Sequence, residues 1–106
     1  MSLDEVFREE CVILELQADV KQAALEEMVA HAVSSKLLPP ARREQVLEIL
    51  LEREARGSTA FGGGIAMPHA RVPKLRRSCG VIARAPGGVD FRAVDGEDVH
   101  VLVMLV

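Results

Sequence analysis

The sequence predicts an α/β domain, with a mixed β-sheet flanked by helices. Two helical patterns lie in the first half of the chain, one short strand pattern precedes them, and further strand patterns with turn signals follow them. Strands on both sides of the helices along the chain are typical of a mixed sheet. The chain has 106 residues, enough for one hydrophobic core, and we expect residues 1–106 to belong to a single domain.

The elements before and including the first helix are defined by short apolar patterns. We expect a helical turn over Leu3–Phe7 and a largely buried strand over Cys11–Leu16 (CVILEL). Asp19 is a candidate N-cap for a helix over Val20–Ser35. Apolar residues recur there at three and four positions and predict the buried side of the helix: Ala24, Leu25, Met28, Val29 and Ala32.

A second helix is expected over Ala41–Glu54, after the break at residues 38–40 (LPP). Pro40 suits the first turn, where the missing amide costs nothing. Arg56 and Gly57 end the helix, because glycine adopts a left-handed cap conformation at the least cost. The buried side of this helix is predicted to comprise Val46, Leu47, Leu50 and Leu51.

Two strands are expected in the second half, Cys79–Ala85 and Asp98–Val106, with turns at residues 86–88 (PGG) and 95–96 (DG). The last strand is apolar on both faces, and a bare apolar strand favours aggregation. Either another chain covers it or these residues are part of a longer protein. We favour the second alternative, a domain whose C-terminal part lies beyond Val106.

Composition and charge exclude several classes of function. The chain has 13 Lys and Arg against 16 Asp and Glu, a net charge of −3, so we expect no nucleic-acid partner. It has three Phe and no Trp or Tyr, too few aromatic side chains for base-stacking surfaces. No apolar run approaches the roughly 18–20 residues of a membrane span, and the acidic N-terminus does not look like a signal peptide. We expect a cytoplasmic protein without direct membrane insertion.

Metal and disulfide chemistry also lack sequence support. Cys11 and Cys79 are far apart in the sequence, without the spacing of a metal site, and free thiols are expected in the cytoplasm. A metal-dependent hydrolase using His69, His31 or His100 would need an HExxH, CxxC or clustered ligand pattern, and none is present. We therefore expect no metal and no cofactor.

A glycine-rich segment at residues 57–69 (GSTAFGGGIAMPH) is the strongest candidate for a functional site. The amides of Gly62, Gly63 and Gly64 are free to approach an anion closely, and phosphate is the usual ligand of such loops. The spacing matches neither a nucleotide-binding P-loop nor a dinucleotide fingerprint. A flexible turn remains the alternative.

His69 stands directly after Pro68 and before a small alanine. Proline stiffens the approach and the small neighbour leaves the imidazole uncrowded, which suits a nucleophilic histidine. The alternative is a surface or structural histidine, and we expect such structural roles for His31 and His100.

Arg53 lies 16 residues before His69, at the end of the second predicted helix. A phosphoryl group on His69 would carry close to two negative charges, and Arg53 with Ser58 and Thr59 is able to supply a guanidinium and donors to it. Arg53 equally suits a helix C-terminus, where cations are favoured. A basic patch beside His69, formed by Arg71, Lys74 and the Arg76-Arg77 pair, is either a solvated loop or a docking site for an acidic partner surface.

Residues 53–70 (REARGSTAFGGGIAMPHA) resemble the active-site signature of the phosphotransferase-system EIIA domains of the fructose–mannitol type, which include the nitrogen-regulatory EIIA proteins. The shared features are the Arg-Glu pair, the Gly-Ser-Thr turn, the glycine-rich loop and the Pro-His pair. Residues 90–96 (DFRAVDG) are similar to the family pattern as well. The resemblance extends over nearly the whole chain and is strongest at its centre.

The resemblance implies a phosphoryl carrier. The histidine matching His69 would accept a phosphoryl group from phosphocarrier HPr and pass it to an EIIB domain, or hold it as a regulatory signal. Arg53 matches the family's active-site arginine, and Gly57, Ser58, Thr59 and Gly62–Gly64 match its phosphate-supporting turn and loop. The alternative is a nitrogen or metabolic regulatory module that acts by phosphorylation-dependent protein binding, and self-association stays open.

Departures from the family pattern fall in two places. The family's domain continues with further helices and a second histidine beyond the position of Val106, and neither His31 nor His100 matches that histidine. Gly63 stands where asparagine is common, and Ala60-Phe61 replaces the more frequent Gly-Ile. We therefore expect the site to be completed by residues beyond Val106.

Overall fold

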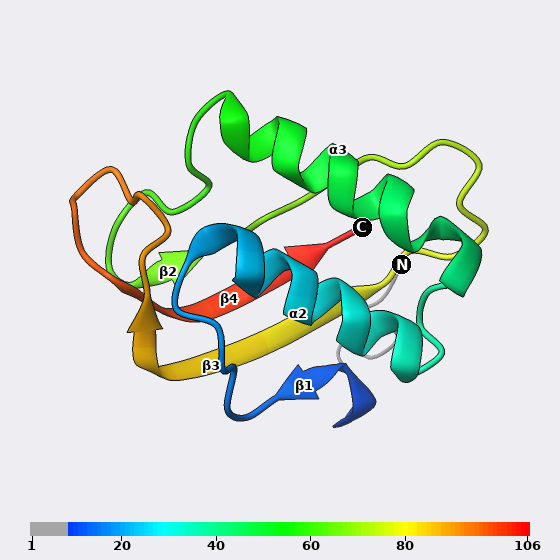
Figure 1. Cartoon of the computed structure of the whole chain (residues 1–106), viewed down its shortest axis with the longest axis horizontal. Coiled ribbons are helices and arrows are strands. Elements are labelled where there is room, and N and C mark those ends of the chain that lie inside the picture. Colours follow the sequence, from blue (N-terminus) through cyan, green and yellow to red (C-terminus); the bar gives the residue numbers. More distant parts are fainter. Residues whose placement is uncertain (1–8) are drawn as a thin grey trace.

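The computed structural model describes residues 9–106, which contain a four-stranded mixed sheet (Figure 1). The strand order is β1-β3-β4-β2, and the central pair, β3 and β4, is antiparallel. The edge strands β1 and β2 run parallel to their neighbours. The predicted fold class is confirmed. The strands are β1 (Val12–Ile13), β2 (Ile65–Ala66), β3 (Gly80–Val89) and β4 (Val99–Leu105).

Two helices, α2 (Lys21–Ser34) and α3 (Arg43–Ala55), cover one face of this sheet (Figure 1). A short 3₁₀ turn, η2 (Pro40–Arg42), leads into α3 with Pro40 in its first turn, as the sequence predicts. No helix of the described residues is long and apolar enough to cross a membrane. The five predicted core positions of α2 are fully buried: Ala24, Leu25, Met28, Val29 and Ala32.

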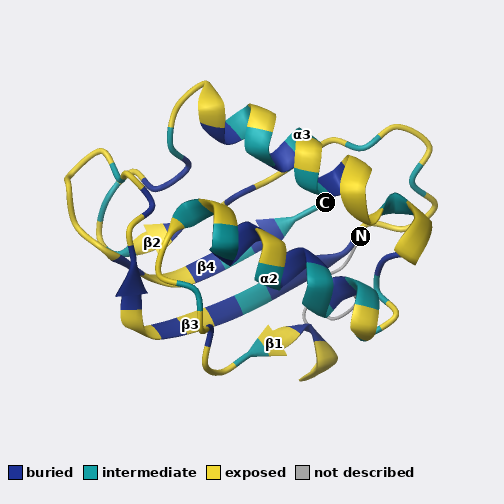
Figure 2. Ribbon diagram, in the orientation of Figure 1, coloured by how far each residue is buried: buried dark blue, intermediate teal, exposed yellow. Residues whose placement is uncertain are grey.

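The core lies between the helices and the sheet (Figure 2). Along β3 the residues alternate, with Val81, Ala83 and Ala85 buried and Arg84 exposed on the other face. On α3, Val46 and Leu50 are buried as predicted. Leu47 and Leu51 are only half-buried, because they lie to one side of the stripe that faces the sheet.

The face of the sheet opposite the helices is partly uncovered. Val101 of β4 is 37% exposed and Ile65 of β2 is 48% exposed, although both are large apolar residues. This agrees with the prediction that the last strand leaves one apolar face without cover.

The N-terminal elements differ from the prediction. The turn expected over Leu3–Phe7 lies outside the described residues. Only Val12–Ile13 of the predicted strand Cys11–Leu16 pair with β3, and Cys11 belongs to a 3₁₀ turn, η1 (Glu9–Cys11). After Ile13 the chain contacts the sheet through isolated hydrogen bonds, such as the one from the Leu16 amide to the Arg84 carbonyl (2.8 Å).

The predicted N-cap at Asp19 is wrong. The residue before α2 is Val20, in an extended conformation, and no side chain caps the helix. The reason is tertiary pairing: Val20 forms a bridge with Asp90, and the Asp19 carbonyl accepts the Asp90 amide at 2.8 Å. The backbone at residues 19–20 is therefore fixed by the sheet.

The predicted turn at residues 86–88 is also wrong. Pro86, Gly87 and Gly88 lie inside β3, and the register with β4 shifts between Arg84 and Val89. Such a shift places proline and glycine where the ladder is interrupted and their lack of an amide or a side chain costs little. The second predicted turn is confirmed, since residues 94–95 form a turn that ends at Gly96 (φ +78°).

Candidate functional site

His69 lies at the end of the short segment that follows β2. It forms a parallel bridge with Leu105, whose amide donates to the Pro68 carbonyl and whose carbonyl accepts the Ala70 amide, both at 3.0 Å. Pro68 is buried and the His69 side chain is exposed. The backbone on either side of the ring is therefore held by β4, while the imidazole is accessible to another protein.

The ring orientation of His69 is set by one hydrogen bond, between Nδ1 and the Met67 carbonyl oxygen at 3.0 Å. A carbonyl oxygen only accepts, so Nδ1 carries the proton in the neutral ring. The lone pair is then on Nε2. The exposed histidine thus has a fixed tautomer with a nucleophilic nitrogen available.

A hollow of about 450 Å³ opens beside His69. Its walls come from the loop that follows the histidine and from the ends of the two central strands. The residues lining this hollow are His69, Ala70, Arg71, Val72, Leu75, Ser78, Cys79, Leu105 and Val106.

Arg53 lies in the last turn of α3, as predicted, and its Nη1 donates to the Gly57 carbonyl at 2.8 Å. Gly57 has φ +150°, so it does not adopt the predicted left-handed cap conformation (φ about +57°). The chain then turns, and the Thr59 carbonyl accepts the Met67 amide at 3.3 Å. Met67 therefore joins the turn that follows Arg53 to the segment that orients His69.

Glu54, next to Arg53, is a site neighbour that the sequence analysis missed. Its side chain is buried, forms a salt bridge with Lys21 (3.2 Å) and accepts from the amide and hydroxyl of Thr59. Lys21 also lies over the ring of Phe91, 5.0 Å from its centroid. The spacing of the buried residues on α3 indicates the burial of Glu54, because Glu54 continues the i, i+4 stripe of Val46 and Leu50.

Ser58 and Thr59 are turned toward the protein. The Ser58 hydroxyl donates to the Phe91 carbonyl at 2.8 Å and accepts the Ala60 amide at 3.1 Å. Thr59 is 2% exposed. Both hydroxyls therefore stabilise the turn in this structure.

The glycine loop lies at the other end of β4 from His69. The Gly64 carbonyl accepts the amides of His100 and Val101, whereas His69 pairs with Leu105, about 13 Å further along the strand at roughly 3.3 Å per residue. The Gly63 amide donates to the Asp95 carboxylate at 3.1 Å. This register gives the loop no contact with His69, and its role in phosphate binding stays a prediction.

The other histidines make structural contacts. Nε2 of His31 lies 2.7 Å from the Glu10 carbonyl oxygen, and Nδ1 of His100 lies 3.0 Å from that of Ala85. In residues 9–106 no group of three or more His, Cys, Asp or Glu side chains is placed to hold a metal ion. Cys11 and Cys79 are both buried free thiols, and burial, with a smaller effect of Cys11, raises the pKa of Cys79 to about 11.

Residues 5–106 match the model of the family described as "Phosphoenolpyruvate-dependent sugar phosphotransferase system, EIIA 2". The fold and the exposed histidine agree with this match. The chain belongs to this family. The match confirms the resemblance noted in the sequence. The protein is an EIIA component of the phosphotransferase-system family, with a carrier or regulatory role.

The chain is similar in sequence or structure to the following three proteins. It is 34% identical over 106 residues to a nitrogen regulatory protein of Bradyrhizobium diazoefficiens, covering all of this chain and 67% of that protein. It is 30% identical over 105 residues to the fructose-specific EIIABC component of Bacillus subtilis, covering 99% of this chain and 16% of that protein. The crystal structure of the nitrogen regulatory protein IIA-Ntr from Neisseria meningitidis superposes with a TM-score of 0.85 at 28% identity, covering 97% of this chain and 68% of that one. The chain thus spans about two thirds of the nitrogen regulatory proteins that it matches.

Proposed function

We propose that this chain carries a phosphoryl group on Nε2 of His69. The observation that carries the proposal is the hydrogen bond from Nδ1 to the Met67 carbonyl on an exposed ring. It leaves one nitrogen with a lone pair at a position that another protein can reach. Family membership supports phosphoryl transfer as the chemistry.

The transfer is a displacement at phosphorus. The lone pair of His69 Nε2 forms the new N–P bond while the N–P bond of the donor phosphohistidine breaks, and its electron pair returns to the donor imidazole. The His69 ring then carries both a phosphoryl group and the proton on Nδ1, so it gains positive charge. The Met67 carbonyl accepts a stronger hydrogen bond from that ring and stabilises the charge. In the next transfer, the nucleophile of the acceptor forms a bond to phosphorus while the N–P bond of His69 breaks. The electron pair of that bond returns to the His69 ring.

Arg53 and the Gly57–Thr59 turn would support the phosphoryl group. Arg53 is half-buried and uses one Nη for the Gly57 carbonyl, so its other N–H groups are available to a phosphoryl oxygen. The Thr59–Met67 hydrogen bond ties this turn to the His69 segment.

The proposed partners are a phosphoryl donor and a phosphoryl acceptor. We propose an EIIB domain as the acceptor, because the Bacillus subtilis relative is named as an EIIABC component. We propose phosphocarrier HPr as the donor, as the family resemblance implies. We propose that the exchange takes place in the cytoplasm, with no metal or cofactor.

A regulatory output is the second candidate, favoured by the 34% identity to a nitrogen regulatory protein. In that case phosphorylated and unphosphorylated His69 would differ in their affinity for a regulatory target protein. The chemistry at His69 is the same, and only the fate of the phosphoryl group differs.

The test is phosphorylation of the chain with phosphoenolpyruvate, enzyme I and HPr. Acid-labile phosphate mapped to His69 by mass spectrometry is the expected result, followed by its loss when an EIIB domain is added. Label that persists with EIIB favours the regulatory output. Absence of label on this chain and on a full-length relative carrying the same histidine would contradict the carrier proposal.

A further inference from the structure

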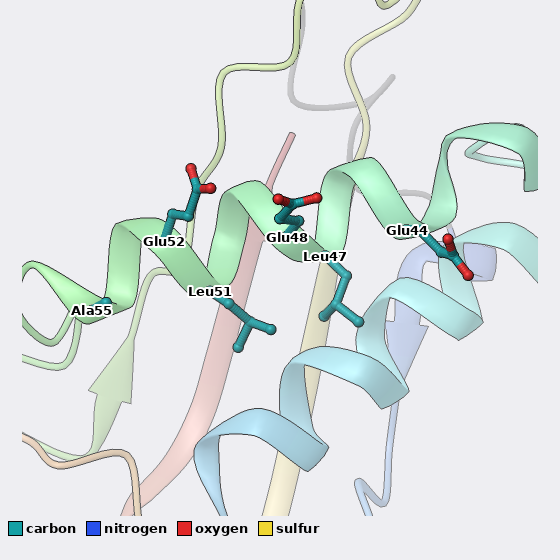
Figure 3. A pocket seen from close by; sticks show the side chains of 6 residues that line it. All are labelled: Glu44, Leu47, Glu48, Leu51, Glu52 and Ala55. Atoms are coloured by element: carbon teal, nitrogen blue, oxygen red, sulfur yellow. The ribbon is translucent and has the colours of Figure 1, made fainter.

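Helix α3 carries a hollow with an apolar floor and an acidic rim, of about 420 Å³ (Figure 3). Figure 3 shows Leu47 and Leu51 pointing the same way from α3, while Glu48 and Glu52 project from its other edge. Both pairs are spaced by four residues, so each forms one line along the helix. We name this surface the acidic hollow. Its lining comprises Glu44, Leu47, Glu48, Leu51, Glu52 and Ala55.

Within residues 9–106 no cation forms a salt bridge with the acidic hollow. None of its lining residues is basic. The only salt bridge among residues 9–106 joins Lys21 to Glu54, which is not part of the hollow. As far as the described residues go, three carboxylates and two half-buried leucines are therefore left to meet another surface.

A surface of the opposite kind is formed by residues 74–77 (KLRR), which we name the basic loop. Lys74, Arg76 and Arg77 are exposed. The backbone at the start of the loop is held in place, because the Arg42 guanidinium donates hydrogen bonds to the carbonyls of Pro73 and Lys74. The basic loop also borders a groove of about 780 Å³ to which no acidic residue contributes.

We propose that a second copy of this chain docks its basic loop in the acidic hollow. Arginine has an apolar stem and a charged, planar head, so Arg76 and Arg77 match a floor of leucine with a rim of glutamate. The guanidinium groups would pair with Glu48 and Glu52 while their stems cover Leu47. Each copy carries both surfaces, so a two-fold arrangement can form the contact twice.

Charge complementarity selects a second copy as the occupant. The acidic hollow and the basic loop are separate surfaces of one copy, because no loop residue lines the hollow. Both surfaces pair apolar area with charge, and the charges are of opposite sign. Exposed ion pairs are individually weak, so the association should be weak, concentration-dependent and reduced by salt.

The test is sedimentation velocity of the 106-residue chain and of two charge-reversal variants, R76E/R77E and E48R/E52R. Wild type should increase in mass with concentration, and each variant alone should dissociate at least roughly tenfold more readily, because like charges then face each other. An equimolar mixture of the two variants should associate again, since the reversed loop of one copy matches the reversed hollow of the other. The control E26R/E97R makes the same charge change as E48R/E52R, at exposed positions outside both surfaces, and should behave as wild type.

Two results would overturn the proposal. One is a wild-type chain that stays monomeric at every concentration and at low salt. The other is association that persists in both reversal variants, which would locate the contact elsewhere, for example on the uncovered face of the sheet. Circular dichroism of each variant establishes that it is folded before its mass is compared.

Discussion

The ring of His69 is oriented by Met67, two residues before it, through a hydrogen bond of 3.0 Å from Nδ1 to the main-chain carbonyl. The amide of the same Met67 donates to Thr59, in the turn that follows Arg53. One residue thus fixes the tautomer of the proposed nucleophile and attaches its segment to the end of α3. Met67 contributes these two bonds through its backbone, so its side chain is free to vary.

Replacing His69 should abolish phosphoryl acceptance without unfolding the chain. The ring is exposed and its one hydrogen bond is to the adjacent backbone, so H69Q should change the free energy of unfolding by less than about 1 kcal/mol. Label from phosphoenolpyruvate, enzyme I and HPr should fall to background. H100Q is the matched control and should keep full labelling, whereas label on H69Q would reassign the acceptor.

Replacing Arg53 should slow labelling more than it affects folding. Loss of a guanidinium that stabilises phosphoryl charge typically costs on the order of 10²–10³ in rate. The lost bond to Gly57 should cost about 1 kcal/mol of stability. The labelling rates of R53A and R53K are compared with that of R56A, which changes an exposed neighbour. Equal rates for R53A and R56A would leave Arg53 with only its role in the turn.

Replacing Glu54 should destabilise the fold strongly. E54A leaves Lys21 without its carboxylate and two Thr59 donors without their acceptor, so the free energy of unfolding should fall by about 3 kcal/mol. E54Q keeps one side-chain oxygen that accepts a hydrogen bond, so its free energy of unfolding should fall by less than that of E54A. The exposed E52A is the control, with an expected change within about 0.5 kcal/mol in urea denaturation. A small effect of E54A would indicate that water replaces the lost partners.

The stability of the chain should fall with pH above about 9. Burial raises the pKa of the Cys79 thiol from 9.0 to about 11, so between these values the unfolded thiol loses its proton while the folded one keeps it. The full contribution of the group is therefore present below pH 9 and is lost as the pH rises toward 11. Urea denaturation across this range measures the slope, and C79A should show a shallower one. Equal slopes would mean that the thiol is better solvated than its burial indicates.

Adding a methyl group at Gly62 should destabilise the glycine loop. A Cβ there would lie 3.0 Å from Oδ2 of Asp95, and the φ of +147° is unfavourable for other residues. G62A should therefore cost about 1–3 kcal/mol of stability in urea denaturation. The labelling rate of G62A, measured at a temperature where it remains folded, separates a structural role of the loop from phosphate binding. Normal labelling supports the structural role, and slow labelling supports the predicted one.

Local sequence patterns predicted much of the fold. The apolar spacing of Ala24, Leu25 and Met28 identifies the buried side of α2, because an α-helix repeats every 3.6 residues whatever it packs against. The Pro68-His69 pair marked the candidate site for a similar reason, since proline restricts its own backbone. Patterns failed at Asp19 and at residues 86–88, where strand pairing overrides the local preference for a cap or a turn.

The two helices, the mixed α/β class and the histidine that the family resemblance marks could be predicted, because they depend on residues close together in the chain. The groups that surround them are known only from the folded chain. Glu54 meets Lys21 across 33 positions, and β4 separates the glycine loop from His69 by its register. Contacts between distant segments depend on how the strands pair, and no local spacing encodes that pairing.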